Sequence, residues 1–265
     1  MTFDVVLPFI VSVIAVASVL LYGRLESKIK SLFQEKEFRV RDSALLVIAM
    51  AVMVSVIVFV PQQALRLLFL VAYSFVLFLF TYLVTEKWYL ALLPSAVFVV
   101  LYLSPLWDLL LLNVFAVMFA VFVTVYLGGV FSWKAVLVFA ALITVMDFIQ
   151  VFGTGLMGAS AEKLWDLKLP IMIVVPTFPV DTQGFKLGLG DLFLTGLLAI
   201  QTSGKYGTRA GVVSACAVGL AFFVFEVTVF ASQFSGVFPA TIVVVCGWLL
   251  GLGVHHLVFQ RNRAS

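Results

Sequence analysis

Residues 109–128 read LLLLNVFAVMFAVFVTVYLG, a run of twenty residues without a charged side chain. A helix of this length spans about 30 Å, which matches the hydrocarbon thickness of a bilayer. A segment that is apolar on every face has no surface to present to water, whereas lipid solvates it well. The stretch therefore predicts a membrane-spanning helix.

The rest of the chain has the same character. Apolar residues make up 64% of the 265 residues and charged residues 11%, against about 45–50% and about 25% in soluble domains. A water-soluble globule of this size could not bury so much apolar surface, and a disordered chain has the opposite bias. The composition indicates an all-α polytopic membrane protein that forms one transmembrane domain over residues 1–265.

Nine apolar runs are long enough to be spans, which divides the domain into five N-terminal helices within 1–130 and four helices within 131–265. The predicted spans are residues 3–22, 43–60, 64–84, 88–104, 109–128, 132–152, 187–203, 208–230 and 238–259. Between the sixth and seventh spans, the stretch 153–186 is longer than an ordinary loop.

The basic residues predict an orientation. With nine spans, twelve of the sixteen Lys and Arg residues fall on one side of the membrane; the other side has Arg66, Lys163, Lys168 and Lys186. The basic side is expected to be cytoplasmic. We therefore expect the N-terminus outside, the C-terminus in the cytoplasm and the 153–186 stretch outside.

Two aspartates lie inside these apolar segments. Counting from Lys134, Asp147 is about 20 Å into the sixth span; counting from Lys186, Asp191 is roughly 7 Å into the seventh from the other side. The two carboxyls thus reach a similar depth, nearer the outer face. Ionisable groups are costly in lipid and usually functional, so a two-carboxylate site is favoured over two separate structural anchors.

Glycines frame the second aspartate in Gly188-Leu189-Gly190-Asp191. Gly188 and Gly190 remove side chains where another backbone must approach. An ordinary helix terminus or small-residue packing would explain the glycines alone.

These residues resemble the GxGD intramembrane aspartyl proteases, the presenilin and signal peptide peptidase family, and most of all its archaeal members. The GxGD motif matches in full. The family's Tyr-Asp pair is Met146-Asp147 here, and its Pro-Ala-Leu motif is Pro239-Ala240-Thr241. The resemblance implies catalysis by Asp147 and Asp191, and substrate binding by Gly188, Leu189, Gly190, Pro239, Ala240 and Thr241.

The resemblance also implies a presenilin-like nine-helix fold in a prokaryotic, archaeal-like cell membrane, without a cofactor or metal. The expected partners are transmembrane peptide or protein substrates and the lipid bilayer, and not nucleic acid. With the 153–186 stretch outside, as in signal peptide peptidases, preferred substrates would have one span with its N-terminus inside.

An aspartyl dyad needs no covalent intermediate. One carboxylate acts as general base on a shared water and the other, protonated, donates to the scissile carbonyl oxygen. A helical substrate hides its peptide bonds, so it must be extended before water can attack. The β-branched run 171–175 reads as a strand. It can pair with 184–189 or with an extended substrate, although a buried or amphipathic piece is the alternative.

Other functions are compatible with the same residues. A proton- or ion-coupled transporter would use Asp147 and Asp191 as carriers, and a membrane chaperone or leak channel is a third possibility. The GxGxxG pattern at 153–158 lacks a βαβ context, so we expect a flexible linker rather than a nucleotide site.

Further polar residues are given structural roles. Ser160 with His255 or His256 would make a serine protease, but the expected topology separates them by roughly 25 Å. The histidines are expected to flank the last span at the interface, and Glu226 to snorkel or to pair locally. There is no HExxH zinc motif.

Overall fold

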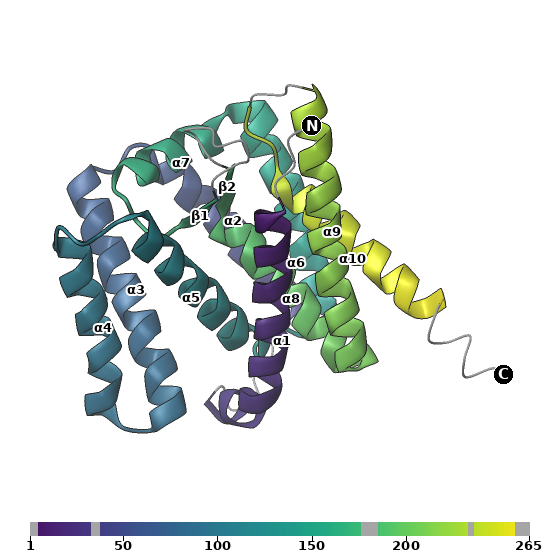
Figure 1. The fold of residues 1–265 in the computed structure, drawn as a ribbon, viewed down its shortest axis with the longest axis horizontal. Coiled ribbons are helices and arrows are strands. Elements are labelled where there is room, and N and C mark those ends of the chain that lie inside the picture. Colours follow the sequence, from purple (N-terminus) through teal and green to yellow (C-terminus); the bar gives the residue numbers. More distant parts are fainter. Residues whose placement is uncertain (1–4, 33–37, 176–184, 233–235, 258–265) are drawn as a thin grey trace.

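The protein is a helical bundle that carries one small sheet (Figure 1). The computed structural model describes residues 5–32, 38–175, 185–232 and 236–257. The helices are α1 (Val6–Leu32), α2 (Val40–Ile57), α3 (Gln62–Thr85), α4 (Trp88–Leu103), α5 (Leu109–Gly128), α6 (Trp133–Phe148), the π-helix η1 (Ile149–Thr154), α7 (Leu156–Asp166), α8 (Leu189–Tyr206), α9 (Thr208–Ser232) and α10 (Ala240–His255); the strands are β1 (Met172–Val175) and β2 (Phe185–Gly188).

Each predicted span coincides with a helix, but the number of spans that meet the criteria of length and composition is smaller than predicted. Within the described residues, six helical segments are long and apolar enough to cross a membrane. They comprise α1, α2, α3, α5, α6 with η1, and α9. The chain is thus a multi-pass helical membrane protein, whereas the count of nine spans is not supported by these criteria.

The three helices that fall short do so for physical reasons. The apolar helices α4 and α10 have 16 residues each, so they are about 24 Å long and shorter than the hydrocarbon core. Ser104 and Pro105 follow α4 directly, and proline disfavours helical continuation. Helix α8 has 18 residues, but it includes Asp191, Gln201 and Lys205.

Helix α8 is the centre of the bundle. It contacts α1, α5, α6, α9 and α10, and every side chain from residue 191 to 200 is buried. Its polar groups have partners within the protein: Thr195 Oγ1 donates to the Asp191 carbonyl at 2.8 Å, and Gln201 Nε2 donates to the Gly128 and Phe131 carbonyls at 2.9 and 2.7 Å. Protein rather than lipid surrounds α8, which explains why it can carry polar residues.

Helices α9 and α10 approach closely through glycines. A Cβ atom added to Gly247 would lie 2.7 Å from Val218 Cα, and one added to Gly251 would lie 2.6 Å from Ser214 Cα. The two glycines are four residues apart and face the same neighbour, as in the small-residue packing of membrane helices. This contact fixes α10 against the bundle.

Exposed lysines lie at one end of the bundle: Lys28 near the end of α1, Lys87 in the α3–α4 turn and Lys205 in the last turn of α8. Figure 1 shows the end of α1, the α3–α4 turn and the α8–α9 turn at its lower end, and α7 with the sheet at the opposite end. We call these the basic end and the sheet end. At the basic end, Lys28 Nζ lies 2.6 Å from Glu86 Oε1, and this hydrogen bond and the lysine charge lower the pKa of the Glu86 carboxyl.

The segment 153–158 is not the flexible linker that we predicted. It consists of the last residues of η1, Gly155 in the left-handed region at φ 67°, and the start of α7. Glycine meets no steric penalty at such a φ, so the chain can turn there from one helix into the next.

Helix α7, which we did not predict, packs on the end of α2. Ser160 Oγ donates to the Val54 carbonyl, and Lys163 Nζ donates to the Val58 and Val60 carbonyls, all at 2.7 Å. The last carbonyls of a helix have no partners within it, so the lysine caps α2. The 153–175 segment is therefore attached to the bundle.

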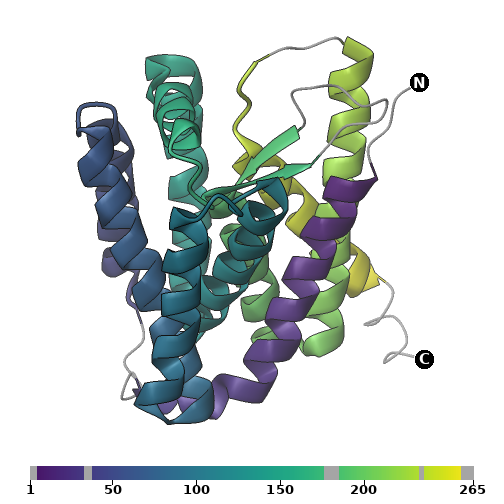
Figure 2. The ribbon, with the colours of Figure 1, turned by 60° about the vertical axis from the view of Figure 1, so that its left-hand side comes forward.

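The predicted β element is confirmed. β1 pairs antiparallel with β2 in the register Met172↔Gly188 to Val175↔Phe185. The Leu189 N–H donates to the Ile171 carbonyl at 3.0 Å, which continues the ladder beyond β2. Figure 2 shows the strands near the upper end of the bundle, and the sheet leads directly into α8.

Candidate functional site

Asp147 lies at the end of α6. The helix begins at its N-cap Ser132, at the basic end, and Asp147 is the residue before its last. Its side chain is 4% exposed. The backbone then changes to the π-helix η1, a feature that is frequent at functional sites. The carboxyl is therefore inside the bundle and close to the sheet end.

Asp191 lies at the start of α8, where the sheet positions it. Gly188 ends β2 and is the N-cap residue of α8, so Asp191 belongs to the first helical turn. A Cβ added to Gly188 would lie 3.4 Å from Asp191 Oδ2, so the carboxyl group folds back over the glycine. Asp191 is 6% exposed, and the register of β2 sets its height in the bundle.

The two predicted carboxyls lie near each other. The charge of Asp147 acts on Asp191 across the contact between α6 and α8. In the described part of the chain, neither aspartate forms an ion pair with Lys, Arg or His. Two buried acids that repel each other without a cation can share one proton. A water molecule held between them would complete a general acid–base pair.

The start of α10 borders this pair. Helix α10 contacts both α6 and α8, and Thr241, which is 2% exposed, interacts with the Asp147 carboxyl through its hydroxyl group. The hydroxyl oxygen has no well-aligned hydrogen bond to the described residues. Pro239 is the N-cap residue of α10 and is buried, and Ala240 is half-buried.

The remaining predicted residues lie on the start of α8. Leu189 is half-buried and packs between two apolar clusters of the core. Gly190 is exposed, and a Cβ added there would meet no atom within 4 Å. The structure thus brings both aspartates and Thr241 together and leaves open space beside Gly190.

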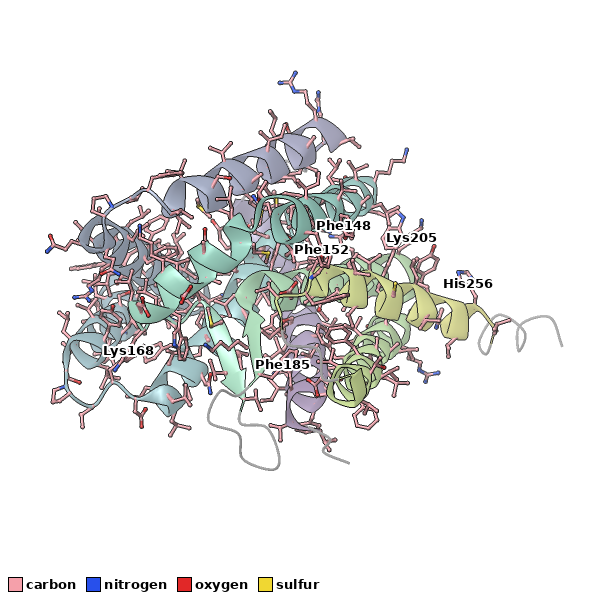
Figure 3. The ribbon with its side chains drawn as sticks, turned by 90° about the horizontal axis from the view of Figure 1, so that it is seen from above. Phe148, Phe152, Lys168, Phe185, Lys205 and His256 are labelled. Atoms are coloured by element: carbon pink, nitrogen blue, oxygen red, sulfur yellow. The ribbon has the colours of Figure 1, made fainter. Side chains whose placement is uncertain are left out.

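Aromatic side chains flank the site, and the sequence reading did not single them out. The ring of Phe238 lies 4.7 Å from that of Phe225 and 6.5 Å from that of Phe152, which in turn lies 5.0 Å from that of Phe148. Figure 3 shows Phe148 and Phe152 beside the start of α10. The sequence could have indicated Phe148 and Phe152, because residues four apart lie on one face of a helix.

Asn113 is a further residue near the sheet that was not predicted from the sequence. Its Nδ2 donates to the Val174 carbonyl at 2.8 Å, and its Oδ1 accepts from the Val174 N–H at 2.9 Å. Both polar groups of Val174 are thereby occupied on the edge of β1 that faces away from β2. The signal was an amide within the otherwise apolar run 109–128.

Other polar residues considered from the sequence lie elsewhere. Ser160 is bonded to the Val54 carbonyl of α2 and is 4% exposed, so this hydroxyl is engaged elsewhere and does not act with the histidines. Glu226 is fully buried, so the prediction that it snorkels is wrong and local pairing remains. In the described residues, no group of three His, Cys, Asp or Glu side chains could hold a metal ion.

No model of a known protein family matches this chain, and no curated protein matches it at a significant level. The assignment of function therefore depends on the residues and their geometry.

Proposed function

We propose that the protein is an intramembrane aspartyl endopeptidase that hydrolyses peptide bonds of transmembrane substrates with Asp147 and Asp191. The observation that supports this function best is the pair of buried carboxyls on the neighbouring helices α6 and α8, where the charge of Asp147 acts on Asp191 and neither group has an ion pair with a described Lys, Arg or His. Burying two acids together is costly. A structural anchor would need one such group, and hydrolysis by a shared water needs both.

The reaction proceeds in two stages. The ionised aspartate removes a proton from the shared water as the water oxygen attacks the scissile carbonyl carbon, and the protonated aspartate donates to the carbonyl oxygen. The tetrahedral intermediate then collapses as the C–N bond breaks: the aspartate that took the water proton protonates the leaving amine, and the other, now ionised, takes back a hydroxyl proton from the intermediate. The Thr241 hydroxyl lies near Asp147 and would orient the Asp147 carboxyl once the two groups align during the reaction.

The sheet offers an edge for an extended substrate. In an antiparallel ladder, the residues whose backbone groups bond to the partner strand alternate. The backbone N–H and C=O groups of Ile173 and Val175, and the C=O of Ile171, are therefore directed to β2. On the other edge of β1, the Asn113 side chain occupies the N–H and C=O of Val174. β2 has no further strand partner in the described residues. The backbone N–H and C=O of Lys186 and the backbone N–H of Gly188, which point away from β1, are therefore available to an added peptide. A strand added there leads to Asp191.

The proposed membrane arrangement has nine spans and the basic end in the cytoplasm. Helices α4 and α10 would cross where the bilayer is locally thin, and α8 would cross inside the ring of its neighbours. The N-terminus and the sheet end would then be outside. The position of the sheet end would resemble that in signal peptide peptidases and be opposite to that in presenilins.

Cleavage of a labelled transmembrane peptide by the purified protein in detergent tests this function. Asp147→Asn and Asp191→Asn are expected to reduce cleavage by at least about 10²- to 10⁴-fold, because each removes a proton-transfer group. Asp166→Asn, which alters the exposed last residue of α7, is the matched control and should cleave normally.

Unfolding temperatures of all three variants must equal that of the wild type for the comparison to hold. Wild-type cleavage by folded Asp191→Asn protein would exclude the dyad. Proton uptake by proteoliposomes with both aspartates intact and no peptide cleavage would instead support the transporter.

A further inference from the structure

The basic end has a second cluster of polar and aromatic side chains, contributed by α6, α8 and α10. Lys205 Nζ lies 4.4 Å from the ring centroid of Trp133 and 5.3 Å from that of Tyr206. The Tyr206 ring lies 5.7 Å from that of Trp133 and 5.5 Å from that of His256. Figure 3 shows Lys205 and His256 toward the far end of α10, away from Phe148 and Phe152.

Buried hydrogen bonds hold the parts of this cluster in place. Trp248 Nε1 donates to Thr202 Oγ1 at 2.8 Å, which joins α10 to α8 one turn before Lys205. Gln201 joins α8 to the turn that precedes Trp133 through its two bonds to carbonyls at 2.9 and 2.7 Å. The cluster is therefore built on fixed helix ends rather than on free side chains.

The surroundings of the cluster are basic. No Asp or Glu occurs in residues 128–146, 192–225 or 227–265, whereas Lys134 and Arg209 are present there and exposed. In the part of the chain that the structure describes, Lys205 and His256 are exposed and neither has an ion pair with a carboxylate.

One acid approaches α8 from another side. Glu26 of α1 lines a cavity together with Ser203 and Gly204, and its carboxylate lies 2.7 Å from Lys30 Nζ. That carboxylate already has a cation, so it does not neutralise Lys205.

We propose that Lys205, Tyr206, Trp133 and His256 bind the phosphate of an anionic phospholipid headgroup. An ammonium group over aromatic rings still directs N–H donors outward, and the imidazole and phenol add further donors for phosphate oxygens. Trp and Tyr are enriched at the headgroup level of membranes, and basic pockets between transmembrane helices bind lipid phosphates.

A lipid at this site would connect the helices that carry the two aspartates and Thr241. The cluster lies at the opposite ends of α6, α8 and α10 from those residues. The lipid site does not depend on proteolysis, so its test does not use cleavage.

The test measures the unfolding temperature of the full-length protein in detergent micelles while phosphatidylglycerol is added, with phosphatidylcholine as the neutral lipid. Phosphatidylglycerol should raise the unfolding temperature in a saturable way, because a ligand that binds the folded state stabilises it. Lys205→Gln should weaken the apparent affinity about fivefold, as expected for one lysine at an anionic surface.

Lys87→Gln is the matched control, because Lys87 is also an exposed lysine at the basic end but lies on the α3–α4 turn. It should keep the wild-type affinity, while His256→Ala, a second variant of the cluster, should weaken binding. Equal titrations for Lys205→Gln, His256→Ala and Lys87→Gln would overturn the site. So would an equal shift with phosphatidylcholine, or full reproduction of the shift by inorganic phosphate.

Discussion

At the scale of single residues, the two glycines at the start of α8 have different surroundings, which indicate a packing role for one and a role in substrate access for the other. Gly188 faces the Asp191 carboxyl at van der Waals distance, whereas Gly190 faces open space and is exposed. Packing of the protein against itself therefore does not explain the glycine at position 190. Access for a second backbone does explain it, and this is the proposed role.

Gly190→Ala separates these roles. Alanine is favoured over glycine in a helix by up to about 1 kcal/mol, and no atom obstructs the added methyl group, so the unfolding free energy should stay equal or rise. Cleavage of the transmembrane peptide should fall, because the methyl group occupies the approach to Asp191.

Gly204→Ala serves as the control, since Gly204 is also in α8 with no atom within 4 Å of an added Cβ. This variant should gain stability and keep full cleavage. If Gly190→Ala also cleaves at the wild-type rate, substrate backbone does not pass beside Gly190.

At the scale of secondary-structure elements, the site depends on how α10 is held. Pro239 is the N-cap residue of α10 and Thr241 lies in its first turn. The helix is fixed by glycines against α9 and by Trp248 against α8. The position of Thr241 next to Asp147 therefore follows from packing farther along the same helix.

Gly251→Ala tests this packing. Its methyl group would collide with Ser214 Cα of α9 at 2.6 Å, and overpacking of this kind costs typically about 1–3 kcal/mol. The unfolding midpoint in a denaturant titration of the purified protein should fall accordingly.

Gly253→Ala lies on the same helix with no atom within 4 Å of its added Cβ, so it should leave the midpoint unchanged or raise it. An equal midpoint for the two variants would mean that α9 and α10 do not pack as closely as described.

At the scale of the whole molecule, the proposed orientation in the membrane rests on the end of the bundle at which the basic residues lie. Lys28, near the end of α1, forms an ion pair with Glu86 of the α3–α4 turn. The end of α1 and this turn therefore lie on the same side of the membrane, as the alternation of spans requires. α7 and the sheet lie on the other side (Figure 1).

Single cysteines in intact cells report this orientation. In a Cys216→Ala/Cys246→Ala background, a membrane-impermeant maleimide should label Glu162→Cys on exposed α7 and leave Lys87→Cys unlabelled until the cells are opened. Ser160 would be a poor position because it is 4% exposed. Labelling of Lys87→Cys alone in intact cells would reverse the proposed orientation.

Much of the architecture was predictable because it depends on local sequence. Apolar runs predicted each long helix, and the β-branched run 171–175 predicted β1 and its partner segment. Helix α7 was missed because the residues of 156–166 are neither apolar enough for a span nor capped by a recognisable signal. Its docking depends on Ser160 and Lys163 meeting carbonyls of α2, about a hundred residues earlier in the chain.

The sequence alone determined that the chain belongs in a membrane and where its long apolar helices lie, and it predicted similar depths for Asp147 and Asp191, because composition and helix rise are local quantities. Only the tertiary structure decided that α8 is enclosed by other helices, that Thr241 faces Asp147, and that Asn113 occupies the outer edge of β1. These features join segments far apart in the chain, and their geometry depends on how side chains of different helices fit together.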